Sequence, residues 1–192
     1  ERVWIAGAFE VQGNLDIRAL EWAFERLIDR HDTLRSSFVR VVDGIERTLH
    51  EPGSVEMRQS TRTTFSSAST LRNHLRSTLE LHCDARRFPS YTCVGIDRPD
   101  TSTILCAFDH SNVDAMSIAV VVDEIHTLYE AYRRCPSNPE TDLPPVGGFV
   151  EYCHIEAVTG YSFRKNFWLP DVKPELLSRN ILDAVHAHRN RY

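Results

Sequence analysis

No Cys-x-x-Cys pair occurs among the five cysteines of this 192-residue sequence. An odd cysteine count without that spacing argues against a zinc ribbon or a disulfide framework, and it favours a reducing compartment. The sequence also lacks an apolar run long enough to cross a bilayer, and its charged start, Glu1-Arg2, does not fit a signal peptide. We therefore expect a cytoplasmic protein with no transmembrane segment. An initiator methionine is missing as well, which indicates a fragment or a trimmed chain.

An excess of positive charge is also absent. Basic residues number 22 against 27 acidic ones, the two signs are intermixed, and the net charge is −5. Without a basic stripe, we expect no nucleic-acid partner. The common zinc-protease, Walker, nucleophile-elbow and dinucleotide motifs are missing too, so we expect no metal site and no bound cofactor. A chain of this length that is 42% hydrophobic can build one core, either a domain or one lobe of a larger domain.

Hydrophobic periodicity predicts alternating strands and helices along the first part of the chain. Residues 3–11 read as a strand, and Asp16 is placed to cap a following helix with its carboxylate. That helix has one apolar face, formed by Ile17, Leu20, Phe24, Leu27 and Ile28. Residues 38–50 then predict a hairpin that turns at Asp43-Gly44.

The second part of the chain continues the same alternation. Residues 66–81 predict a helix, and residues 91–96 and 103–109 predict neighbouring antiparallel strands. The second of these strands is apolar on both faces, as a central strand would be. Residues 115–134 predict a long helix, and the Pro-rich residues 135–145 a surface linker.

A His-x-x-x-Asp cluster, His110 to Asp114, lies between the last strand and the long helix. A histidine at a strand end, on the turn into a helix, is well placed to meet a ligand. For a lone histidine the alternative of a hydrogen-bonded structural residue would be favoured. The block from Arg30 to Phe38, with the order Arg-His-Asp-x-Leu-Arg-x-x-Phe, adds a second signal upstream.

Together these blocks resemble conserved regions of the condensation and acyltransferase superfamily. This superfamily includes the condensation domains of nonribosomal peptide synthesis, chloramphenicol acetyltransferase and the polyketide-associated acyltransferases. The resemblance covers Val3 to Tyr152, and the blocks that carry it are residues 13–20, 30–38, 110–114 and 149–153. A lone His-x-x-x-Asp is a weak motif, but these blocks in sequence are fairly specific.

The resemblance implies an α/β (α+β) fold, a chloramphenicol-acetyltransferase-like lobe in which a mixed β-sheet is flanked by helices. Residues 1–154 would form the N-terminal lobe. Residues 155–192 would be a tail or linker towards a missing C-terminal lobe. The family's tandem histidine is replaced here by Asp109-His110, and the glycine after the Asp by Ala115. These departures favour the acyltransferase branch, and with it a role in lipid biosynthesis.

His110 is the predicted catalytic residue. A neutral imidazole can accept the proton of an alcohol or amine while that group attacks a thioester carbonyl. By resemblance, Asp114 supports the site through an ion pair with an arginine, and Arg30 and Arg35 are the candidates. Asp114 also sits where it can cap the following helix, and we expect a structural role for it.

Hydroxyl and amide groups near His110 are candidates for binding the oxyanion or the substrate. Ser117 matches a family serine after the motif, whereas Ser111 and Asn112 are weaker candidates. His31 is expected to belong to the scaffold, at a helix C-terminus.

The predicted function is acyl transfer from a carrier-protein or coenzyme A thioester to a hydroxyl or amine acceptor. Phosphopantetheine or coenzyme A would be a co-substrate and not a bound cofactor. The expected partners are an acyl carrier protein or acyl-CoA, together with a C-terminal lobe of the same polypeptide or an oligomeric partner. The alternatives are a non-catalytic binding or scaffolding lobe, an inactive fragment of such an enzyme, or a thioester hydrolase.

Overall fold

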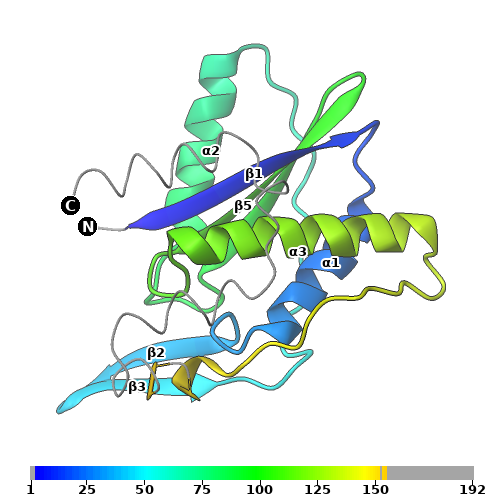
Figure 1. Ribbon diagram of the computed structural model, residues 1–192. Coiled ribbons are helices and arrows are strands. Elements are labelled where there is room, and N and C mark those ends of the chain that lie inside the picture. The colour runs from blue at the N-terminus through cyan, green and yellow to red at the C-terminus, as the bar shows by residue number, and fades with distance from the viewer. Residues whose placement is uncertain (1–2, 152, 155–192) are drawn as a thin grey trace, which may run out of the picture.

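A computed structural model describes residues 3–151 and 153–154 (Figure 1). Its central layer is a three-stranded antiparallel sheet with the order β1-β5-β4, formed by β1 (Trp4–Gln12), β5 (Thr101–Asp109) and β4 (Tyr91–Asp97). The central strand β5 is the apolar one, as predicted, because both of its faces are covered.

Helices α1 (Ile17–Arg30) and α3 (Ala115–Arg134) pack against each other on one face of this sheet. The Asp16 carboxylate accepts the amide hydrogen of Ala19 and so begins α1, which confirms the predicted cap. Helix α3 packs closely against β1 at Gly7, opposite Ile118 and Val122. A Cβ at Gly7 would lie 2.6 Å from Cγ2 of Val122, so the close approach of this helix requires glycine there.

Helix α2 (Ala68–His82) covers the opposite face of the sheet (Figure 1). It begins at the Ser67 cap and buries Leu79, which packs in one cluster with Ala107 of β5. The sheet is therefore flanked by helices on both faces, which confirms the predicted α/β class. All pairings among the described strands are antiparallel, so the mixed pairing we expected is not present in this part of the chain. The short β4–β5 connection, residues 98–100, imposes antiparallel pairing.

A hairpin of β2 (Ser36–Val41) and β3 (Gly44–Leu49) projects from the end of α1 (Figure 1). Its turn differs from the prediction by one residue. Gly44 pairs with Val41, which leaves Val42 and Asp43 at the tip. No non-glycine residue in the described chain has a positive φ, so this tip is not the type I′ turn expected for Asp-Gly.

The main core lies between the sheet and the α1–α3 layer. Its centre is a cluster of Phe24, Tyr91 and Phe108 with ring centroids 5.8–6.1 Å apart. No helix in the described residues is long and apolar enough to span a bilayer. Residues 155–192, predicted to be a tail or linker, lie outside the described residues.

Candidate functional site

The loop after β5 presents His110 at the surface. Backbone hydrogen bonds fix its start: Asp109 donates to Ser90 O at 2.9 Å, and His110 donates to Val3 O at 2.9 Å. The Asp109 carboxylate then accepts the Ser111 amide hydrogen at 2.9 Å. The His110 side chain is exposed, and these hydrogen bonds hold its backbone in place.

A pocket of about 280 Å³ opens beside His110. Its polar lining comes from the His110 loop, the start of α3 and the end of α1. The rest of the lining is mainly apolar and includes Leu34, Val121, Phe149 and Cys153. A histidine base and apolar side chains in the same pocket suit a substrate with a reactive head and a hydrocarbon portion.

Asp114 is the N-cap of α3, so its capping role is confirmed. Its Oδ1 accepts the amide hydrogens of Met116 at 3.1 Å and Ser117 at 2.8 Å, and the Ser117 hydroxyl at 2.7 Å. The expected ion pair with Arg30 or Arg35 does not form, because both arginines have other partners. Arg30 binds Glu124 and Pro144 O, and Arg35 donates to the carbonyl of His50.

We predict that Asp114→Asn leaves the free energy of unfolding within about 0.5 kcal/mol of wild type, whereas Asp114→Ala lowers it by about 1 kcal/mol. The Asn side chain keeps the oxygen that accepts the helix amides, and Ala removes it. Urea unfolding measures both values, with Asp123→Ala at an exposed position of the same helix as the control. Equal losses for Asn and Ala would show that the charge matters and not the cap.

Two of the three candidate oxyanion donors are already engaged. The Ser117 hydroxyl donates to Asp114, as described above. The Asn112 side chain is buried and donates to Ser90 Oγ at 2.6 Å. Ser111 is exposed, and its hydroxyl lies 3.5 Å from Asn112 Oδ1, so it is the least committed of the three.

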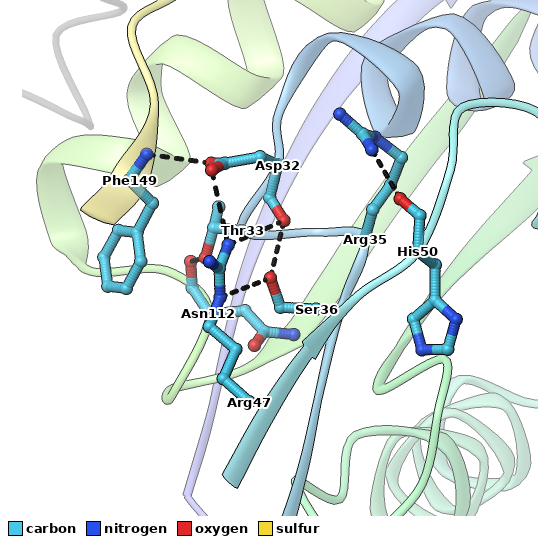
Figure 2. A network of polar contacts seen from close by, with 8 residues as sticks. All are labelled: Asp32, Thr33, Arg35, Ser36, Arg47, His50, Asn112 and Phe149. Carbon is cyan, nitrogen blue, oxygen red and sulfur yellow. Dashed lines mark hydrogen bonds and ion pairs between the residues drawn. The ribbon is translucent and has the colours of Figure 1, made fainter. Parts of the chain in front are cut away.

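A second group of site residues lies at the C-terminal end of α1, in residues 30–33, which we call the anchor turn. His31, expected to belong to the scaffold, is the C-cap of α1, and its Nε2 lies 2.8 Å from Oε2 of Glu124 in α3. The next residue, Asp32, accepts the amide hydrogen of Phe149 at 2.9 Å (Figure 2). Thr33 donates to Asn112 O at 3.1 Å (Figure 2). The anchor turn thus contacts every element that lines the pocket.

Glu124 was missed by the sequence analysis. It is 5% exposed and binds His31 at 2.8 Å and Arg30 at 3.2 Å. Burial alone would raise the pKa of Glu124, but the hydrogen bond and charge of His31, and then those of Arg30, hold it below the ordinary value. A signal was available, because Glu124 interrupts the apolar stripe of α3 between Val121 and Leu128.

We predict that Glu124→Gln lowers the free energy of unfolding by about 2 kcal/mol at neutral pH. Because the pKa of folded Glu124 is lowered, its contribution is present above the unfolded value of 4.5 and is lost as the pH falls through the folded value. The difference between wild type and variant should therefore shrink in acid. Denaturant unfolding from pH 7 to pH 3 measures it. Glu130→Gln, in an exposed pair on the same helix, is the control, and identical pH curves for both variants would contradict the assignment.

A cysteine nucleophile behind the loop is not supported by the electrostatics. Cys83 is fully buried close to Asp109. Burial, and then the nearby Asp109 carboxylate, raise the pKa of the Cys83 thiol to about 12. The thiol is therefore neutral near pH 7, whereas a nucleophilic cysteine needs the thiolate.

Solved structures of known proteins share this fold. One is described as PapA2 acyl transferase, with a TM-score of 0.67 and 24% identity over 82% of this chain and 33% of that one. Another is a starter condensation domain mutant of rhizomide synthetase in complex with C8-CoA and Leu-SNAC. It has a TM-score of 0.62 and 16% identity over 80% of this chain and 35% of that one. These likenesses confirm the predicted chloramphenicol-acetyltransferase-like fold of condensation domains.

Sequence comparison establishes the family. Residues 3–184 match the condensation-domain family model, and the chain belongs to the condensation-domain family, as the sequence blocks predicted. Trehalose-2-sulfate acyltransferase PapA2 of Mycobacterium tuberculosis is 29% identical over 147 residues, 76% of this chain and 30% of that protein. In the same organism, 2'-acyl-2-O-sulfo-trehalose (hydroxy)phthioceranyltransferase PapA1 is 30% identical over 152 residues, 78% of this chain and 28% of that protein. The chain thus spans less than a third of the length of these two relatives.

Proposed function

We propose that the full-length protein transfers an acyl group from a thioester to a hydroxyl acceptor, with His110 as the general base. The observation that carries the proposal is the position of His110, exposed on a fixed loop beside a pocket lined by both polar and apolar side chains. The two acyltransferase relatives support the reaction class.

In the proposed reaction, a ring nitrogen of His110 removes the proton from the acceptor hydroxyl as its oxygen attacks the thioester carbonyl carbon. A carbon–oxygen bond forms and the carbonyl oxygen becomes an oxyanion, which in our proposal accepts a hydrogen bond from the exposed Ser111 hydroxyl. The carbon–sulfur bond then breaks, and the imidazolium returns the proton to the leaving thiolate. The products are the ester and a free thiol, and no acyl-enzyme is required.

The relatives bear on both substrates. PapA2 and PapA1 are named for acylation of trehalose derivatives, which favours a hydroxyl over an amine acceptor here. The rhizomide synthetase condensation domain was solved with C8-CoA, which favours a coenzyme A or phosphopantetheine thioester as donor. In our proposal, the part of the active site that this chain does not supply comes from a C-terminal lobe of the same polypeptide or from an oligomeric partner.

The test is release of free thiol from a panel of acyl-CoAs and acyl carrier protein thioesters, with and without sugar and amine acceptors. It uses the full-length natural protein and the 192-residue chain. We expect release by the full-length protein that depends on a hydroxyl acceptor. Release without any acceptor would identify a hydrolase. No release from either acyl-CoA or acyl carrier protein donors would favour a non-catalytic binding lobe.

A further inference from the structure

One wall of the pocket is attached to the rest of the protein differently from the others. The His110 loop, the start of α3 and the end of α1 are continuous with the sheet and the core. The remaining wall is the helical segment that begins at Phe149, and Phe149 and Cys153 of this segment line the pocket. It follows the irregular residues 135–148, so tertiary contacts must hold it in place.

Asp32 supplies the central contact. Its Oδ1 accepts the Phe149 amide hydrogen at 2.9 Å, and its Oδ2 accepts from Arg47 at 3.3 Å (Figure 2). A carboxylate at the first amide of a helical segment also interacts favourably with its dipole. The Asp32 side chain is only 20% exposed, so this hydrogen bond is partly shielded from competing water.

Arg47 reinforces the same contact from the hairpin. Its guanidinium lies 5.8 Å from the centre of the Phe149 ring, and its Nε donates to Ser36 Oγ at 2.9 Å. Ser36 Oγ in turn donates to Asp32 O at 2.6 Å. Both the backbone and the ring of Phe149 are therefore held by this one polar network (Figure 2).

We propose that Asp32 is a positioning residue that fixes the Phe149 wall and so sets the width of the pocket beside His110. The group that enters there is apolar, because Phe149 faces the pocket together with Leu34, Val120 and Val121. If the proposed function holds, that group is the acyl portion of the thioester. Asp32 then determines selectivity for acyl shape without touching the reacting atoms.

The first test does not depend on activity. Hydrogen exchange of the peptide that contains Phe149 is compared in full-length wild type, Asp32→Ala and Asp32→Asn. We expect the Phe149 amide to exchange about 10-fold faster in the Ala variant and close to the wild-type rate in the Asn variant, which keeps an acceptor oxygen. The control is Asp43→Ala, which removes an exposed carboxylate from the hairpin tip. Unchanged exchange in Asp32→Ala would overturn the role of Asp32.

The second test measures selectivity with butyryl-CoA and isobutyryl-CoA, which have the same carbon number and different widths. We expect Asp32→Ala to shift the ratio of their kcat/KM values about 5-fold towards the branched donor, through KM and with little change in kcat. Asp32→Asn, which keeps the acceptor oxygen, should show the same ratio of kcat/KM values as wild type. Faster exchange with an unchanged ratio would refute control of width. If wild type transfers no acyl group, the proposed function fails, and the exchange experiment still decides whether Asp32 holds the wall.

Discussion

His110→Ala is expected to lower acceptor-dependent thiol release by 10²- to 10⁴-fold (about 3 to 5 kcal/mol of transition-state stabilisation), the range typical of a general base. The substitution removes the only group in our mechanism that takes the acceptor proton. The loop should survive it, because the hydrogen bonds that fix residues 109–111 come from the backbone and from Asp109. Steady-state kinetics of the full-length protein measure the effect.

The matched control is His126→Ala. His126 is also exposed, on α3, and its ring contacts Phe9 instead of the pocket. We expect it to keep activity within a few-fold of wild type. A His110→Ala variant as active as the His126→Ala variant would remove His110 from the mechanism.

Phe108→Ala is expected to cause the largest loss of stability, about 3 to 5 kcal/mol. Phe108 is fully buried, and its ring lies 6.1 Å from that of Phe24 and 5.8 Å from that of Tyr91. Truncation leaves a cavity where the sheet meets α1, close to His110 along the same strand. Thermal unfolding should show a fall in Tm of roughly 10 °C for a chain of this size.

The control for this substitution is Leu81→Ala at a site that is 52% exposed. We expect it to change the free energy of unfolding by less than about 0.5 kcal/mol. Similar losses for both variants would mean that the aromatic cluster is not the centre of the core.

Much of the fold follows from local sequence signals. The apolar spacing of α1, its Asp16 cap and the span of α3 agree with the structure because each depends on residues within a few turns of one another. The central position of β5 follows from its apolar character on both faces. The predicted position of the hairpin tip was wrong by one residue. The strand register pairs Val41 with Gly44, which places Val42 and Asp43 at the tip and not Asp43 and Gly44.

The partners of the site residues were harder to predict, because they lie far apart in the sequence. Asp32 and the Phe149 amide are separated by 117 residues, and no local pattern joins them. The arginine partner of Asp114 was expected by resemblance. The Asp114 carboxylate instead caps α3, and Glu124 takes Arg30.

Imidazole rescue of the His110→Ala variant tests the central claim most directly. If His110 acts as the base, added imidazole should restore acceptor-dependent thiol release in a saturable manner, because the pocket of about 280 Å³ admits a molecule of that size. The His126→Ala variant should not respond. Near-wild-type release by His110→Ala without imidazole, together with no response when imidazole is added, would contradict the account.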